Sequence, residues 1–250
     1  LENKGLDEFK DLPPFAREQL KERYTGGDIC IQACADDEQV AFHAVRNLIR
    51  KARSTVTMKW SQSGFAAIGN RMETPRNLFG FKDGTANATK EDQFNKIVWC
   101  DKDNWMKGGS YMAVRRIQMH LETWDRTNLN EQENTFGRYK ESGAPLGEKD
   151  EFATIDLEKK GPDGKLYIPE DSHVHLAHKT GVELLRRSYS YADGINDTTG
   201  QFESGLLFIS FQKNPQQFIT VQNSLGNEDK MNEYITHIGS GLFACFGGVK

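Results

Sequence analysis

The stretch YMAVRRIQMHLET, residues 111–123, alternates apolar and polar side chains and predicts a long β-strand. A second stretch, GLLFISF at residues 205–211, is apolar at consecutive positions, which indicates a strand buried on both faces. Five further elements belong with these two: a helix at 128–136, a strand at 183–191, helices starting near Pro215 and near Asp229, and a last strand at 241–246. In chain order, with the two consecutive helices near Pro215 and Asp229 counted as one helical segment, the elements read β-α-β-β-α-β, which is the ferredoxin-like arrangement.

The first part of the chain predicts half of a similar unit. Residues 28–33 are expected as a strand, Asp36 or Asp37 as the cap of a helix ending near Arg53, and residues 55–60 as a second strand. If the two parts are equivalent, a preceding β-α-β segment is missing from this sequence. We therefore predict an α+β fold of tandem ferredoxin-like (β-α-β-β-α-β) domains, the first incomplete in this chain.

These elements divide the chain into three regions. Residues 1–60 are interpreted as the C-terminal part of the first ferredoxin-like domain and residues 111–250 as the second domain. Residues 61–110 are interpreted as a connector between them, and this connector carries an unusual acidic loop.

Composition and cysteine spacing narrow the classes of partner and site. The 250 residues carry a formal net charge of -4 without a basic patch, which argues against a nucleic-acid partner. No apolar run is long enough to span a bilayer. The four cysteines form no metal or redox motif, and Cys30 and Cys34, about 13 Å apart on the expected strand, are too distant for a disulfide. We interpret these two as buried thiols.

The acidic loop is NLFGFKDGTAN, residues 77–87, which sets Asp83 between aromatic residues and a glycine. An Asp-Gly pair is most often a turn, because glycine tolerates positive φ and aspartate bonds its own backbone. Here small residues, Gly84, Thr85 and Ala86, follow the carboxylate and would let a flat ligand or another backbone approach closely. Turn and ligand site therefore both remain open at this point.

Three of the six histidines, His173, His175 and His178, cluster in DSHVHLAH. In an extended segment His173 and His175 project to one side. They could then hold zinc or non-haem iron with a third ligand, or one imidazole could ligate a haem iron. The alternative is that all three are ordinary polar residues, which is the usual outcome for a lone histidine.

Downstream, LLRRSYSYADG places Arg186 and Arg187 next to each other on an expected strand, so their side chains face opposite ways. A buried guanidinium needs an anionic partner, whereas a solvated pair needs none. An acid in a glycine-flanked turn, a histidine and a strand arginine together suit peroxide chemistry. Breaking the O–O bond requires a group that carries a proton between the two oxygens and a fixed cation beside the developing negative charge.

At these residues the chain resembles the dye-decolourising-type (DyP) haem peroxidases, and most of all their EfeB-like deferrochelatase/peroxidase branch. The family signature G-x-x-D-G stands here as GFKDG at Gly80, within the longer form LFGFKDGTAN. Further matching motifs run along the whole chain in order: ETP at Glu73, GGSY at Gly108, WDRT at Trp124, FGR at Phe136, GAPLG at Gly143, DSHV at Asp171, LRRSYSY at Leu185 and GLLFISFQ at Gly205.

The resemblance implies roles for individual residues. Asp83 matches the distal acid, Arg186 the distal arginine, and His173 the proximal haem ligand and hence the metal ligand. The cofactor-binding set implied by the family is Gly84, Thr85, Ala86, His173, His178 and Arg186. His178 to Thr180 read HKT where the family often has Asn-Pro-Arg, so this stretch departs from the pattern. Arg115 is a candidate for a haem propionate or for a structural ion pair.

The function implied by the resemblance is a haem b peroxidase, with one haem per chain held mainly by the second domain. It would reduce hydrogen peroxide while oxidising a donor, and would also release iron from haem in bacterial iron uptake. The expected partners are haem and hydrogen peroxide, with an iron-permease system at the membrane and a second copy in a homodimer as further candidates.

Export is expected as well, to a secreted, cell-surface or periplasmic location, because members of this branch carry a twin-arginine signal. No such signal lies in this sequence, and the usual continuation after GGVK is absent, so we expect a trimmed chain. Two alternatives remain: a haem-binding or haem-delivery protein with incidental peroxidase activity, and a histidine-cluster metalloprotein without haem.

Overall fold

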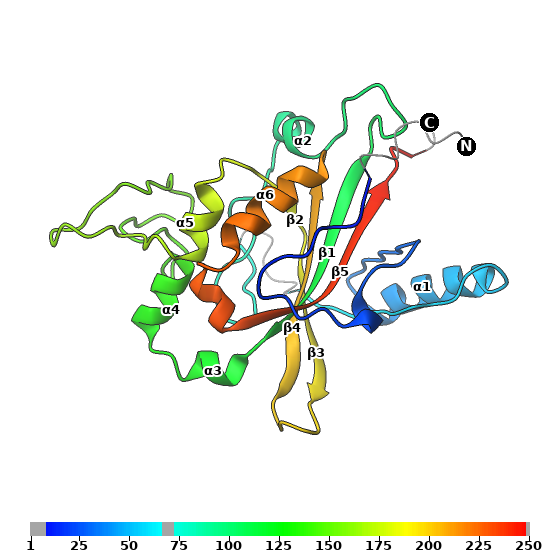
Figure 1. The fold of residues 1–250 in the computed structure, drawn as a ribbon, viewed down its shortest axis with the longest axis horizontal. Coiled ribbons are helices and arrows are strands. Elements are labelled where there is room, and N and C mark those ends of the chain that lie inside the picture. The colour runs from blue at the N-terminus through cyan, green and yellow to red at the C-terminus, as the bar shows by residue number, and fades with distance from the viewer. Residues whose placement is uncertain (1–8, 67–72, 249–250) are drawn as a thin grey trace.

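The computed structural model describes residues 9–66 and 73–248, and one antiparallel sheet lies at its centre (Figure 1). The sheet order is β2-β4-β1-β5, and β3 also pairs with β4. The strands are β1 (Ser110–Met119), β2 (Leu185–Arg186), β3 (Tyr189–Ile195), β4 (Phe202–Gln212) and β5 (Ile235–Cys245). With β2 and β3 taken as successive parts of one edge, the predicted β-α-β-β-α-β order and ferredoxin-like class are confirmed.

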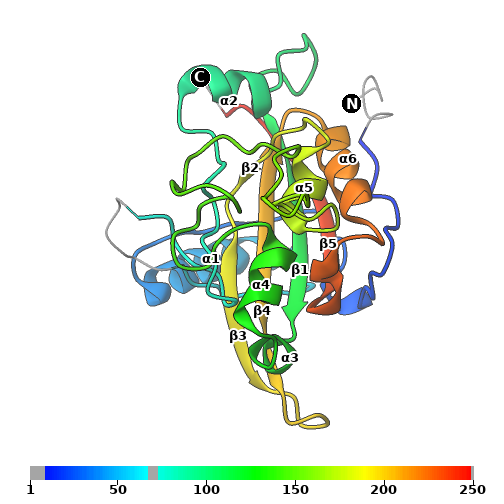
Figure 2. The same cartoon turned by 90° about the vertical axis from the view of Figure 1, so that its left-hand side faces the viewer.

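The helices lie on both sides of this sheet. They are the 3₁₀ helices η2 (Glu22–Tyr24) and η3 (Lys230–Glu233) and the α-helices α1 (Glu38–Ala52), α2 (Glu91–Ile97), α3 (Leu121–Asp125), α4 (Leu129–Phe136), α5 (His173–His178) and α6 (Pro215–Leu225). In Figures 1 and 2, α4 and α5 lie on one side of the sheet and α1 on the other. Of the helices in the described part of the chain, none is long and apolar enough to cross a membrane.

Strand β1 is the middle of the sheet and is buried at every position except Gln118. The buried positions include two arginines, Arg115 and Arg116, which are 1% and 3% exposed. Each has a carboxylate partner. Arg115 Nη2 lies 2.5 Å from Glu18 Oε2, and Arg116 Nη2 lies 2.6 Å from Asp193 Oδ2. A charge in a dry site is tolerated only with such pairing, so the central strand depends on these ion pairs. Of its two candidate roles, Arg115 takes the structural one.

Several element boundaries differ from the sequence predictions. The strand expected at 183–191 is interrupted at residues 187–188, although β2 and β3 keep one register against β4. The last strand begins at Ile235 rather than near 241, and the helix expected near Asp229 is the short 3₁₀ helix η3. The helix starting at Pro215 is confirmed, because Asn214 caps it by accepting from Gln216 N.

The two strands predicted at 28–33 and 55–60 are not formed. Neither segment pairs with a strand in the described part of the chain, and Ile29 is 70% and Met58 58% exposed. A strand needs a ladder partner for its backbone groups, which alternation alone cannot supply. Cys30 and Cys34 are likewise exposed rather than buried. Helix α1 does form, because Asp37 accepts hydrogen bonds from the first-turn amides, yet none of its residues is buried.

Candidate haem site

The acidic loop is anchored by its aromatic residues. Phe79 and Phe81 are 3% and 2% exposed and pack in one cluster with Trp124. The Phe81 ring stacks on Phe136 with 3.9 Å between the ring centroids. Asn77 Oδ1 accepts hydrogen bonds from the backbone N–H groups of Phe79 and Phe81. This apolar anchor fixes the start of the loop, so that the polar residues after it are held in a defined place.

Asp83 and Arg186 meet in the folded chain, although 102 residues separate them. Arg186 Nη1 lies 3.3 Å from Asp83 Oδ1, and the side chains are 31% and 22% exposed. Both residues line a cavity of about 440 Å³, together with Gly84 and Thr85. The pair therefore places one carboxylate and one cation against the same open volume.

Asn87 holds this pair together through the backbone. Its Nδ2 donates to Arg186 O at 2.8 Å, and its Oδ1 accepts from Arg186 N at 3.0 Å. The side-chain amide thus bonds the outer edge of β2 as a neighbouring strand would. Sequence reasoning missed this residue, because an asparagine at the end of a turn carries no signal of a distant partner.

Gly84, Thr85 and Ala86 are placed differently from one another. Gly84 has φ +110°, a backbone conformation that residues other than glycine rarely adopt. Thr85 Oγ1 donates to Glu151 Oε1 at 2.9 Å. Ala86 is exposed and is not among the residues that line the cavity.

His173 starts helix α5, whose N-cap is Ser172. Its Nδ1 lies 2.7 Å from Asp229 Oδ2, and the Asp229 side chain is only 2% exposed. Burial acts to lower the pKa of His173, but the charge and hydrogen bond of Asp229 outweigh it and raise the pKa. Asp229 thereby orients the ring and leaves Nε2, which bonds no described residue, as the free nitrogen. Asp229 was predicted only as part of a helix start.

The expected extended arrangement of His173 and His175 is wrong, because residues 173–178 are helical. Residues two apart on a helix point to nearly opposite sides, so these two imidazoles cannot share one metal. His175 Nδ1 is buried without a hydrogen-bond partner. His178 is the last residue of α5, and partial burial of its ring together with the charges of Arg138 and Arg186 lowers its pKa. No group of three metal-ligating side chains occurs among residues 9–66 and 73–248.

The two adjacent arginines have different partners. Arg186 pairs with Asp83, whereas Arg187 Nε donates to Tyr189 Oη at 3.1 Å. Arg187 also lines the cavity that Asp83 and Arg186 line. The structure brings Asp83, Arg186 and His173 into one region, since the charges of Asp83 and Arg186 both act on the pKa of His173.

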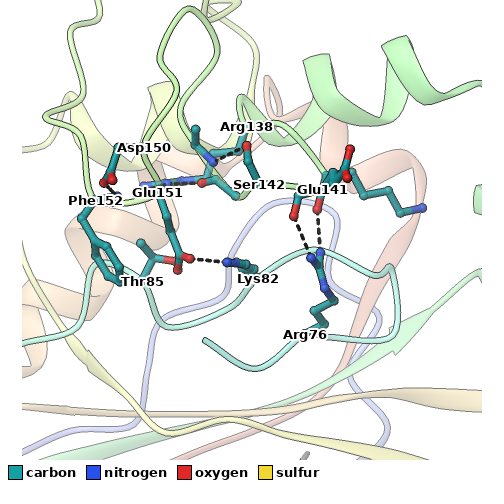
Figure 3. Close-up of polar contacts among 12 residues, drawn as sticks. Arg76, Lys82, Thr85, Arg138, Glu141, Ser142, Asp150, Glu151 and Phe152 are labelled. Atoms are coloured by element: carbon teal, nitrogen blue, oxygen red, sulfur yellow. Dashed lines mark hydrogen bonds and ion pairs between the residues drawn. The ribbon is translucent and has the colours of Figure 1, made fainter. Parts of the chain in front are cut away.

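A polar network joins the acidic loop to the excursion at residues 138–152 (Figure 3). Lys82 and Thr85, on either side of Asp83, both bond the Glu151 carboxylate. Burial acts to raise the pKa of Glu151, but hydrogen bonds from Lys82 and its neighbours lower it overall. Arg76 Nη1 donates to Gly80 O and Lys140 O at 2.7 and 2.6 Å. The loop is therefore held from its exposed side as well as from its aromatic side.

The donor set fits haem better than a bare metal ion. One imidazole with a carboxylate behind it is an axial-ligand arrangement, and a lone protein nitrogen is too few for zinc. The acid–arginine pair supplies a proton carrier and a cation in the same region.

Comparisons with known proteins agree along the whole chain. The family model described as "Dyp-type peroxidase, N-terminal" matches residues 1–66, and the model described as "Dyp-type peroxidase, C-terminal" matches residues 74–250. The Deferrochelatase of Escherichia coli (strain K12) is 40% identical over 258 residues, which cover 97% of this chain and 60% of the relative. The chain thus spans less than two thirds of the length of this curated relative.

Solved structures give the same result. DtpA from Streptomyces lividans, in its X-ray generated oxyferrous complex, matches with a TM-score of 0.92 and 35% identity, covering 100% of this chain and 71% of that one. A DyP-type peroxidase from Cellulomonas bogoriensis matches with a TM-score of 0.91 and 35% identity, covering 97% of this chain and 69% of that one. Fold and sequence likeness therefore point to one group of proteins.

Proposed function

The chain belongs to the Dyp-type peroxidase family, and from that premise we propose that it is a haem b enzyme that reduces hydrogen peroxide while oxidising a donor. The observation that carries this proposal is the Asp83–Arg186 pair, 3.3 Å apart on the wall of one cavity. A protein that only carried haem would have no use for a proton carrier and a fixed cation at the same open volume.

His173 holds the cofactor in this proposal. Its Nε2 would hold the iron, while Asp229 accepts a hydrogen bond from Nδ1–H, which fixes the ring orientation and would make the ligand more basic. When bound, haem supplies the iron at which the peroxide O–O bond is broken and where the oxidising equivalents are held. Gly84, Thr85, Ala86 and His178 are proposed to border the cofactor.

Asp83 and Arg186 act on peroxide. The Asp83 carboxylate accepts a proton from one peroxide oxygen and returns it to the other, so that water can leave. The Arg186 guanidinium stabilises the negative charge that develops as the bond breaks. Asn87 holds the Arg186 backbone to the Asp83 loop and is proposed to position the two groups for this transfer.

The test is peroxide consumption by haem-loaded variants. Asp83→Asn and Arg186→Leu should keep the haem absorption spectrum, yet each should lose on the order of 10²-fold or more in peroxide consumption. Arg187→Leu is the neighbouring control, and its loss should be about tenfold smaller because its guanidinium bonds Tyr189. Wild-type peroxide consumption in both Asp83→Asn and Arg186→Leu would refute the enzyme and leave the haem carrier as the better interpretation.

We also propose that the protein releases iron from haem, leaving the porphyrin ring intact with two protons in place of the metal. The support is the likeness to the Escherichia coli protein named Deferrochelatase. Incubated haem-loaded protein should yield free iron together with fluorescent metal-free porphyrin in equal amounts. Iron without intact porphyrin would indicate ring destruction and contradict this part of the proposal.

The remaining proposals concern organisation and location. Residues 1–60 form the C-terminal part of a first ferredoxin-like domain, residues 61–110 a connector, and residues 111–250 a second domain with one haem. The two family models meet between residues 66 and 74, which supports two domains, although the second model also takes in most of the proposed connector; limited proteolysis should cut first within 61–110. Export, a homodimer and an iron-permease partner are proposed by family likeness. Cell fractionation, sedimentation velocity and co-purification with the permease would test them.

A further inference from the structure

The backbone of Arg138 lies next to α5, the helix that carries His173. It directly follows Gly137, the residue that ends α4 with φ +85°. A Cβ on Gly137 would lie 3.0 Å from Ser172 Oγ and 3.1 Å from Val174 Cβ. Ser172 and Val174 flank His173 in the sequence, so the backbone at 137–138 is packed against the start of α5.

The guanidinium of Arg138 reaches from there to the elements that hold the acidic loop (Figure 3). Its Nη1 donates to Gly143 O at 2.6 Å and to Glu151 O at 3.0 Å. A Cβ on Gly143 would lie 2.6 Å from Lys82 Cδ, so this turn touches the residue before Asp83. Arg138 therefore connects the histidine side of the site with the Asp83 side.

The charge of Arg138 is not matched by a protein carboxylate. Among the described residues no Asp or Glu lies within ion-pair distance of it, whereas Arg186 has one in Asp83 and the two arginines of β1 have Glu18 and Asp193. Glu151 gives Arg138 only its carbonyl oxygen, because its carboxylate bonds Lys82 and Thr85. Burial and the charge of Arg186 both lower the pKa of Arg138, and Glu151 opposes this shift.

The Arg138 charge also acts on His178, whose pKa is lowered by burial and by the charges of Arg138 and Arg186. Two guanidinium groups thus share a region in which only Arg186 has an acidic partner. A partly buried cation without a counter-ion is costly, and a guanidinium can bind a carboxylate ligand through two parallel hydrogen bonds. Nη1 of Arg138 donates to two carbonyl oxygens, whereas Nε and Nη2 bond no described residue.

We propose that Arg138 binds a carboxylate of the cofactor, one of the two propionate groups that are the only ionised side groups of haem. This inference rests on the proposed haem function. Arg138 is a binding residue in this role: it neutralises the propionate and orients the ring between α5 and the acidic loop, and it takes no part in proton transfer.

The test titrates haem-free protein with two iron porphyrins that differ only in the carboxylates, haemin and haemin dimethyl ester. Arg138→Gln should weaken haemin binding on the order of ten- to a hundredfold, because a hydrogen bond to a charged group is lost. It should change binding of the dimethyl ester by less than about twofold, since the ester has no charge to lose. Arg138→Lys should recover part of the haemin affinity, as a cation without the guanidinium geometry.

Lys140→Gln is the matched control, because it removes one positive charge two residues away whose Nζ bonds Gln132. It should leave the ratio of the two affinities unchanged. Equal losses for haemin and ester in Arg138→Gln and Arg138→Lys would show a purely structural arginine and overturn the inference. Failure of wild-type protein to bind haemin at all would instead refute the proposed function.

Discussion

Replacing Asn87 by alanine tests whether the distance between Asp83 and Arg186 is set by one side-chain amide. Asn87 makes two hydrogen bonds to the backbone of Arg186. Asn87 Nδ2 donates to Arg186 O at 2.8 Å, and Asn87 Oδ1 accepts from Arg186 N at 3.0 Å. Both Arg186 groups lie on the edge of β2 that faces away from β4. Alanine would leave them to water, and the loop that carries Asp83 would lose its direct bond to the strand that carries Arg186.

The magnitude follows from the two bonds. Each neutral hydrogen bond contributes about 0.5–1.5 kcal/mol net, so Asn87→Ala should lower the free energy of unfolding by about 1–3 kcal/mol. For a chain of this size, a change of about 2 kcal/mol lowers the melting temperature by roughly 4–8 °C. A shift of about 1 Å between the two side chains should slow peroxide consumption by roughly 10²-fold.

The matched control is Gln93→Ala. Gln93 Oε1 also accepts two hydrogen bonds in this region, from Thr89 N and Lys90 N, but it does not touch Arg186. Urea unfolding of both variants gives the loss of stability, and stopped-flow mixing of the haem-loaded proteins with peroxide gives the rate. We expect similar losses of stability in the two variants and a slow reaction only in Asn87→Ala.

A second substitution separates the two bonds. Asn87→Asp keeps the oxygen that accepts from Arg186 N but turns the donor into another acceptor, opposite Arg186 O. It should therefore be at least as destabilising as alanine. If Asn87→Ala loses stability like Gln93→Ala but consumes peroxide at the wild-type rate, the amide does not position the Asp83–Arg186 pair for the proposed reaction, and the reasoning is refuted.

Three further outcomes are expected. His173→Ala should yield largely haem-free protein by absorption spectroscopy while His175→Ala stays loaded, and the reverse result would move the ligand assignment to His175. Burial, together with the charges of Arg115 and His173, lowers the pKa of His237 to about 3. In the unfolded chain this ring takes up a proton near pH 6.5. The neutral His237 ring therefore makes its full contribution to the free energy of unfolding above that pH and loses it as the pH falls towards 3. The free energy of unfolding of wild type relative to His237→Asn, in haem-free protein, should fall by up to about 1.4 kcal/mol per pH unit between pH 6 and 4, and a constant difference would contradict this. Glu18→Gln should cost about 3–5 kcal/mol in urea unfolding by leaving the Arg115 charge buried and unpaired, and a loss under about 1 kcal/mol would mean that water replaces the pair.

Local patterns predicted much of the second half of the chain. The apolar run at 205–211 became the interior of β4, and Asn214 with Pro215 started α6, because burial on both faces and end-capping are written into neighbouring residues. The family motifs also pointed to Asp83, His173 and Arg186 before their arrangement was known. Each of these signals lies within a few consecutive positions of the sequence.

Pairings between distant segments could not be obtained in this way. Asp229 behind His173 lies 56 residues further along the chain, and Asn87 bonds Arg186 across 99 residues. The sequence between such partners does not encode which groups meet, since that depends on how the sheet and its loops pack. The same limit applies to Arg138, because the FGR motif does not specify its partners Gly143 and Glu151.

Tertiary context also decided the conformation of ambiguous segments. Residues 173–178 alternate histidines as a strand would, yet they form a helix capped by Ser172 and packed against α4 and α6. Residues 28–33 and 55–60 have strand composition but no ladder partner in the described chain, so their backbones stay irregular. Composition states what a segment can become, whereas the hydrogen-bond partners and the burial that select one outcome come only from the rest of the fold.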